Sequence, residues 1–269
     1  MPYLCSNCQR SFPNFQLSCP DCGSWNSLKL QSSHIAHEDA RPVALPDIGS
    51  FVIPRIRTKV AQLDELLGDG FVPGSSVLLI GPPGAGKSTL LMQVLKKMNI
   101  DSLYVTGEES IQQLKLRADR LKINSHNIFL LFEMNVNKIS AHVRHTPTKV
   151  LVIDSIQTMY TEASDTLPGS STQIRKCAYI LRRLAQEKSF VLIVVGQVTK
   201  DKKAAGPKLL EHAVDVVLYL EVDEGKSAKD NQHHRLLFAS KNRFGSTTPR
   251  CQLLMRKTGL VFHDAGSSI

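Results

Sequence analysis

The sequence predicts an α/β protein in which helices flank a mainly parallel central sheet, with a small four-cysteine zinc ribbon at the N-terminus. Three observations predict this fold class. Apolar runs of strand length alternate with helical segments, a pattern typical of parallel sheets that are covered on both faces. The stretch GPPGAGKS, residues 81–88, connects one such run to a helix. Two CxxC pairs lie within the first thirty residues.

The composition is that of a globular chain, with 42% hydrophobic and 21% charged residues in a length of 269. No run approaches the roughly 18 apolar residues of a membrane span, and the N-terminus lacks a secretory signal pattern. We therefore expect a cytoplasmic protein without a membrane partner, whose six cysteines are metal ligands or buried thiols. The net charge of +9 favours an anionic partner such as a nucleic acid or a nucleotide.

The N-terminal unit, residues 1–30, is expected to hold one Zn²⁺. Two CxxC knuckles separated by ten residues offer four thiolates for a closed tetrahedral site: Cys5, Cys8, Cys19 and Cys22. Such a site stabilises a segment that is too small to bury an adequate core. Two unrelated pairs or a redox dithiol are the alternatives. Trp25, the only tryptophan, is expected to pack on the knuckle, with base stacking as its alternative role.

Residues 31–50 show no sustained hydrophobic period and contain prolines, so they are predicted to form a linker. Its two histidines, His34 and His37, fit solvated side chains better than metal ligands. The main domain is expected over residues 51–265, followed by a tail at 266–269.

The segment GPPGAGKS matches GxxxxGK[ST] at every fixed position and therefore predicts a nucleoside-triphosphate site. The glycines let backbone N–H groups face phosphate oxygens, and the helix that begins near Lys87 directs its positive end at the same anion. Lys87 is expected to reach the β- and γ-phosphates, and Ser88 to ligate Mg²⁺. The predicted nucleotide contacts are Gly81, Pro82, Pro83, Gly84, Ala85, Gly86, Lys87, Ser88 and Thr89.

Polar side chains follow the predicted strands, where ligands of such sheets bind. The strand-forming segments are 102–110, 148–157, 189–200, 215–222 and 234–242, and residues 173–188 are predicted to be helical. Asp154 is expected to hold Mg²⁺ through water. Glu108 is the first choice and Glu109 the second for orienting or deprotonating the attacking water, although one of them could instead cap the following helix. Gln197 is expected to sense the γ-phosphate, or else to be a plain strand-end amide.

A basic loop at residues 198–212 predicts contact with the backbone of DNA or RNA. Its lysines are Lys200, Lys202, Lys203 and Lys208, and the preceding helix adds Arg175, Lys176, Arg182 and Arg183. Few aromatic residues are interleaved, so binding of weak sequence specificity is expected. A solvated basic surface is the alternative.

These motifs, with LDELLGDGFVPG, YVTGEES, VIDSIQ, AGPKLLEH and KNRFG, make the chain closely similar to the bacterial RadA (Sms) family of RecA-related DNA repair ATPases. KNRFG, residues 241–245, is the most specific of them. The resemblance implies a RecA-like P-loop fold that uses ATP, Mg²⁺ and Zn²⁺ and acts on single-stranded or branched DNA. It also implies branch migration, helicase activity, and a recombinase or helicase as a partner.

By the same resemblance, Lys241 and Arg243 complete the ATP site of an adjacent subunit, so a homo-oligomer, ring or filament, is expected. Residues i and i+2 of a strand share a face, which would place both cations together. Gly245 is expected to let the chain turn. The alternative is a solvated cationic turn.

Two departures from the family pattern bear on these expectations. Family members continue into a Lon-protease-like domain, whereas this sequence ends at LMRKTGLVFHDAGSSI, and Gln197 stands where histidine is typical. Two other function classes therefore stay open: a RecA-fold regulatory ATPase resembling KaiC, and a degenerate relative that binds ATP and partners without motor activity. Stimulation of ATP hydrolysis by DNA would separate a motor from both.

Overall fold

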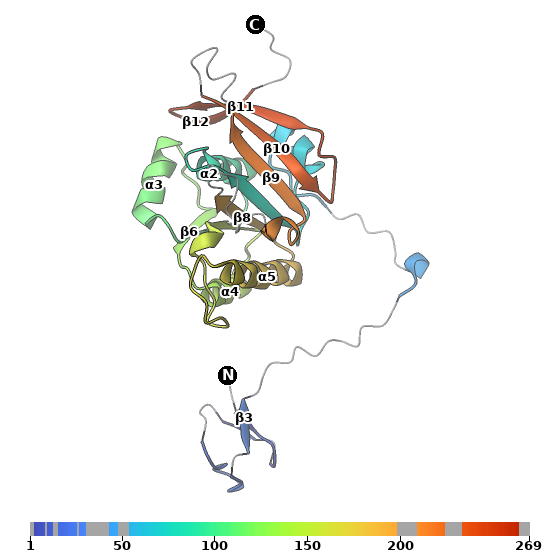
Figure 1. Cartoon of the computed structure of the whole chain (residues 1–269), viewed down its shortest axis with the longest axis vertical. Coiled ribbons are helices and arrows are strands. Elements are labelled where there is room, and N and C mark those ends of the chain that lie inside the picture. The colour runs from blue at the N-terminus through green and yellow to red at the C-terminus, as the bar shows by residue number, and fades with distance from the viewer. Residues whose placement is uncertain are drawn as a thin grey trace. The chain divides into compact units, whose positions relative to one another are not determined.

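The computed structural model describes residues 3–8, 10–12, 16–25, 27–30, 43–47, 54–197, 209–223 and 233–263. The chain divides into two compact units, Met1–Phe51 and Val52–Ile269 (Figure 1). Within the described ranges, no helix is both long and apolar enough to cross a membrane. Several sequence predictions fall outside the described residues: the loop lysines Lys200, Lys202, Lys203 and Lys208, the linker histidines His34 and His37, and the tail 266–269.

The first unit contains a small antiparallel sheet with strand order β2-β1-β3. Its elements are β1 (Tyr3–Cys5), β2 (Ser11–Phe12), β3 (Leu28–Leu30) and the 3-10 turn η1 (Leu45–Asp47). Its buried apolar cluster consists of Cys5, Cys19 and Leu28, which is too little buried area to hold a fold without a further staple. Trp25 is 75% exposed, so the expectation that it packs on the knuckle is wrong.

The second unit is built on a nine-stranded sheet of order β12-β11-β10-β9-β4-β8-β7-β5-β6. The strands are β4 (Ser76–Gly81), β5 (Ser102–Thr106), β6 (Ile128–Phe132), β7 (Val150–Asp154), β8 (Val191–Gln197), β9 (Val216–Val222), β10 (His234–Asn242), β11 (Arg250–Arg256) and β12 (Gly259–Phe262). Neighbouring strands are parallel throughout the part of the sheet ordered β9-β4-β8-β7-β5-β6, which confirms the predicted fold class.

The last strands of the sheet differ from the prediction. The segment 234–242 was expected to join the parallel sheet, but β10 is antiparallel to β9, and β11 and β12 continue in the same antiparallel manner. A parallel crossover takes a dozen or more residues, and residues 223–233 are too few to provide it. The sheet therefore has a parallel centre and an antiparallel extension.

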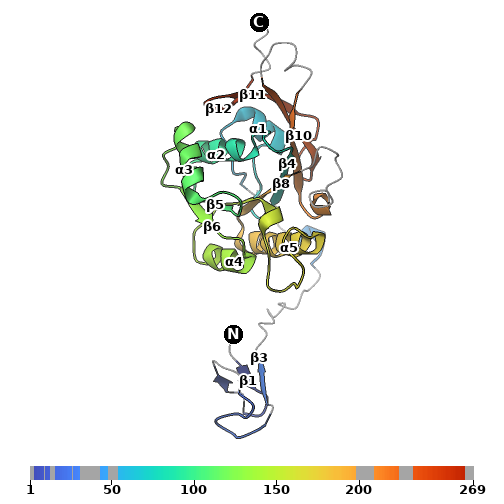
Figure 2. The ribbon, with the colours of Figure 1, turned by 60° about the vertical axis from the view of Figure 1, so that its left-hand side comes forward.

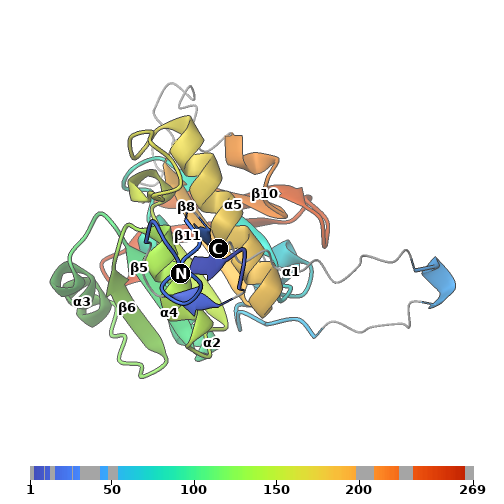
Figure 3. The ribbon, with the colours of Figure 1, turned by 90° about the horizontal axis from the view of Figure 1, so that it is seen from below.

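Helices cover both faces of this sheet (Figures 2 and 3). They are α1 (Ala61–Leu67), α2 (Lys87–Met98), α3 (Ile111–Arg120), α4 (Val136–Arg144) and α5 (Ser171–Lys188), with the 3-10 turn η2 (Ile156–Thr158) after β7. Alternate residues of β4 supply the two cores: Val77 and Leu79 pack with α1, α2 and α3, whereas Leu78 and Ile80 pack with α4 and α5. Burial on both faces explains why this strand is apolar throughout.

Candidate functional site

The phosphate loop connects the buried strand β4 to α2 at the carboxyl edge of the parallel strands. Gly84 and Gly86 adopt φ angles of +75° and +107°, a region that glycine enters without steric cost. The loop can therefore fold its N–H groups inward around an anion. Helix α2 begins at Lys87 and directs its N-terminus at the same space. The local geometry is that of a phosphate cradle.

Lys87 lies back across this loop. Its Nζ donates hydrogen bonds to the carbonyl oxygens of Gly81 at 2.7 Å and Pro82 at 2.9 Å. Burial lowers the pKa of Lys87, and the carboxylates of Asp154 and Glu108 oppose that shift. A buried ammonium near two carboxylates is well placed to exchange its carbonyl partners for phosphate oxygens.

Ser88 and Asp154 meet from α2 and the end of β7. The Ser88 hydroxyl donates to Asp154 Oδ2 at 2.6 Å. Mg²⁺ prefers hydroxyl and carboxylate oxygens of this kind together with substrate phosphates. The donor set therefore fits the magnesium site that the sequence predicts.

Tyr104 of β5 is a neighbour of Asp154 that sequence reasoning missed. Its hydroxyl also donates to Asp154 Oδ2, and its side chain is fully buried. Burial, and then the charge of Asp154, raises the pKa of Tyr104 well above its usual value, so the hydroxyl remains a donor. Nothing in the run YVTGEES reveals this contact, because it depends on the pairing of β5 with β7.

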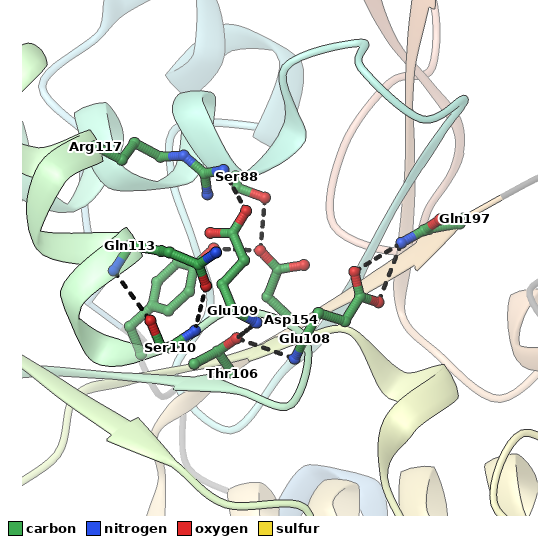
Figure 4. A network of polar contacts seen from close by, with 10 residues as sticks. Ser88, Thr106, Glu108, Glu109, Ser110, Gln113, Arg117, Asp154 and Gln197 are labelled. Atoms are coloured by element: carbon green, nitrogen blue, oxygen red, sulfur yellow. Dashed lines mark hydrogen bonds and ion pairs between the residues drawn. The ribbon is translucent and has the colours of Figure 1, made fainter.

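The two glutamates that follow β5 have different partners (Figure 4). Gln197 donates through Nε2 to both carboxylate oxygens of Glu108, at 3.1 and 3.0 Å, and the Ser155 hydroxyl donates to the same carboxylate. Glu109 instead forms an ion pair with Arg117 of α3, at 2.6 Å. The charge of Glu109 is thus matched by a cation, whereas Glu108 is held by neutral donors.

Neither glutamate is the N-cap of α3. That position belongs to Ser110, whose hydroxyl accepts from the N–H of Gln113 while the Gln113 side chain accepts from the Ser110 N–H. Neither carboxylate is therefore used to cap the helix.

A pocket of about 440 Å³ surrounds these groups, which is within the usual range of ligand sites. The predicted residues that line it are Pro83, Gly84, Gly86, Lys87, Ser88, Thr89, Glu108, Glu109, Asp154 and Gln197. Three further lining residues escaped sequence reasoning: Arg117, Arg120 and Met255. Met255 comes from β11, and no local pattern ties that strand to the phosphate loop.

Lys241 and Arg243 do not line this pocket. Asn242 between them pairs with Val216, which in turn pairs with Val77 near the start of β4. The phosphate loop follows the other end of β4, about 13 Å away at roughly 3.3 Å per residue. The two cations therefore lie at the amino ends of the parallel strands, whereas the phosphate loop of their own chain lies at the carboxyl ends.

The chain bends at residues 243–245, as expected of Gly245, and this glycine also has a packing role. Its φ is not in the left-handed region, but an added Cβ would lie 2.9 Å from the Cα of Gly68, at the end of α1. Gly245 therefore permits a close approach of two backbones, and this contact fixes the motif against α1.

The four cysteines of the first unit form a compact cluster. Their Sγ atoms all lie within 4.8 Å of one another, with Cys5–Cys22 and Cys8–Cys19 each at 3.6 Å. Tetrahedral Zn²⁺ with Zn–S bonds of about 2.3 Å requires sulfur separations of about 3.8 Å. The cluster therefore fits a closed structural zinc site.

Comparison with known proteins agrees with these motifs. The AAA domain family matches residues 40–203. DNA repair protein RadA of Bacillus subtilis (strain 168) is 38% identical over 276 residues, covering 96% of this chain and 58% of the relative. RadA of Escherichia coli (strain K12) is 36% identical over 275 residues, with the same coverage. The predicted resemblance to RadA is confirmed, and the chain spans 58% of the length of these relatives.

Solved structures show the same fold at lower identity. A KaiC-like protein from Pyrococcus horikoshii OT3 has a TM-score of 0.65 at 22% identity, covering 79% of this chain and all of that one. A second solved structure, described as an ATPase domain, has a TM-score of 0.63 at 18% identity, covering 78% of this chain and 91% of that one. Both similarities support a RecA-like arrangement of the second unit.

Proposed function

We propose that this chain, which belongs to the AAA domain family, is a DNA-dependent ATPase of RadA type that acts in recombinational DNA repair in the cytoplasm. The observation that carries the proposal is the pocket at the carboxyl edge of the sheet. It combines the phosphate loop, the Ser88–Asp154 pair and the Glu108–Gln197 pair. These are the groups that binding and hydrolysis of a nucleoside triphosphate require.

In this proposal the phosphate loop and the N-terminus of α2 bind the triphosphate, and Lys87 turns from its carbonyl partners to the β- and γ-phosphates. Ser88 and Asp154 would hold Mg²⁺, which would neutralise charge on the phosphate oxygens. Glu108 orients the attacking water and accepts its proton, while Gln197 fixes the position of the Glu108 carboxylate. Glu109 is the weaker candidate, because Arg117 already engages it.

DNA contact is assigned to the loop at residues 198–212, on the strength of its charge and of the RadA resemblance. This loop begins directly after Gln197, whose side chain donates hydrogen bonds to Glu108, so a DNA contact there is one residue and one hydrogen-bonded pair away from the carboxylate. We propose single-stranded or branched DNA as the ligand, and movement along it during branch migration as the outcome. The zinc unit is proposed to bind a recombinase or helicase partner.

Arg243 is proposed to serve the ATP site of an adjacent copy, within a ring or filament, with Lys241 beside it in the motif. Both cations lie at the amino ends of the parallel strands and line no part of the nucleotide pocket of their own chain, which supports this proposal. In trans, a guanidinium can stabilise the charge that develops on the transferred phosphoryl group.

Steady-state ATP hydrolysis with and without single-stranded DNA tests the proposal, and mixing two inactive variants tests the shared site. Lys87→Ala removes phosphate binding and Arg243→Ala removes the trans cation. If the site is shared, the mixture regains activity, because some interfaces join an intact pocket to an intact Arg243. Slow hydrolysis that is indifferent to DNA and to Arg243 would favour a regulatory or degenerate ATPase instead.

A further inference from the structure

A buried carboxylate lies beside the KNRFG motif. Asp215 directly precedes β9, and its side chain is 9% exposed. Its Oδ2 accepts hydrogen bonds from the N–H of Ser76 at 3.0 Å and from the Ser76 hydroxyl at 2.7 Å. Buried charges need such donors to offset lost hydration. The carboxylate is therefore fixed to the first residue of β4.

Two arginines from distant segments reach the other oxygen of this carboxylate. Arg243 Nη1 lies 3.4 Å from Asp215 Oδ1, and Arg182 Nη2 of α5 lies 3.6 Å from the same atom. Their side chains are 54% and 31% exposed, so both guanidinium groups also face solvent. Two cations share one anion, which leaves positive charge available to a further anionic group.

Lys241 is engaged differently. Its Nζ donates to the backbone carbonyls of Glu211 at 2.9 Å, His212 at 3.4 Å and Val214 at 2.7 Å. An ammonium has three donors, and three carbonyls occupy them. Burial lowers the pKa of Lys241, and the charge of Arg243 lowers it further. Lys241 thus holds the turn at 211–214 that leads into Asp215, and it has little capacity left for a phosphate.

We propose that Arg182 and Arg243, held side by side by Asp215, are the two cations that meet the phosphate chain of a nucleotide bound by an adjacent copy. Lys241 contributes by holding the turn at residues 211–214. This inference rests on the proposed function, because it assumes the shared site. Guanidinium groups bind phosphate oxygens in pairs of parallel hydrogen bonds, which an ammonium cannot do. Asp215 acts as a positioning residue that orients both groups before the nucleotide arrives.

The test compares Arg182→Ala with Lys188→Ala, a control that removes an exposed cation in the last turn of α5. Because the cation acts on transition-state charge, Arg182→Ala should lower kcat at least about tenfold with KM for ATP nearly unchanged. Lys188→Ala should keep kcat. Mixing Arg182→Ala with Lys87→Ala should restore activity, as expected for Arg243→Ala. Lys241→Met should lower Tm, whereas Arg182→Ala should not.

The outcomes separate this inference from the proposed function. If Arg243→Ala is rescued by Lys87→Ala but Arg182→Ala behaves like Lys188→Ala, the inference is overturned and the shared site stands. If Arg243→Ala is not rescued, the shared site itself fails, and the inference fails with it. An Arg182→Ala defect that appears only as weaker DNA affinity would place this residue in the DNA surface and would also overturn the inference.

A readout independent of turnover is the self-association that ATPγS induces, measured by sedimentation velocity. Arg182→Ala and Arg243→Ala should each weaken it, and Lys188→Ala should leave it unchanged. Assembly that does not respond to Arg182→Ala contradicts the inference even if the chain hydrolyses ATP very slowly.

Discussion

Replacing each of the adjacent glutamates with glutamine separates two carboxylates that the sequence presents as equals. Glu108→Gln keeps the size of the side chain but removes the charge that would orient and deprotonate water. Glu109→Gln removes the partner of Arg117 and leaves the Gln197–Glu108 contact in place. The structure predicts very unequal effects.

The expected magnitudes follow from the environment of each group. Loss of a general base costs about 10²–10⁴-fold in kcat, so Glu108→Gln should reduce turnover by at least about 100-fold. The side chains of Glu109 and Arg117 are 34% and 22% exposed. Solvent screens such a pair to about 0.2–1 kcal/mol, which is no more than about fivefold in any rate or affinity. Glu109→Gln should therefore stay within about fivefold of the parent.

The assay is steady-state release of phosphate at saturating ATP, paired with equilibrium binding of a fluorescent ATP analogue. Glu108→Gln should bind the analogue with nearly unchanged affinity, because the phosphate loop is untouched. The reasoning is refuted if Glu109→Gln loses as much kcat as Glu108→Gln, or if Glu108→Gln retains more than about a tenth of parental turnover.

Three further predictions concern other parts of the chain. Tyr104→Phe removes a buried donor to Asp154, so the Mg²⁺ concentration for half-maximal nucleotide binding should rise about tenfold; an unchanged Mg²⁺ titration contradicts the contact. Burial raises the pKa of Cys177 and Cys251 to about 12, so both should stay protonated and react slowly with a thiol reagent at pH 8. Removing the metal should release one zinc per chain and let the first unit unfold, which exposes its four cysteines to the reagent; six fast thiols before the second unit unfolds would disagree. Trp25 is 75% exposed, so its fluorescence should be strongly quenched by iodide in the native chain, and a shielded, blue-shifted emission would show that it packs on the zinc knuckle after all.

Contiguous patterns were sufficient where the required geometry is local. Residues 81–88 predict their own loop because glycines and a following helix N-terminus create the anion site within a few residues. The cysteine spacing predicts a metal cluster for the same reason, since each CxxC knuckle is a local turn. The position of Asp154 was predictable as well, because a buried apolar run that ends in a carboxylate indicates the carboxyl end of a parallel strand.

Contacts between strands were not predictable in this way. Hydrophobic periodicity indicates which residues of a strand are buried, but it does not indicate which strands are neighbours. The order β4-β8-β7-β5 brings Gln197 to Glu108 and Tyr104 to Asp154, and the first of these contacts is what distinguishes Glu108 from Glu109.

Contacts at the amino ends of the parallel strands could not be predicted from the sequence either. From the sequence, Lys241 and Arg243 form a pair because they stand two residues apart. In the folded chain, Lys241 donates hydrogen bonds to three backbone carbonyls. Arg182 of α5 and Arg243 both form ion pairs with the buried carboxylate of Asp215. The sequence by itself determined the fold class, the phosphate loop and the metal cluster, since these depend on short-range patterns. Only the tertiary structure decided which charges share a partner, because those partners lie on segments that the packing of strands and helices brings together.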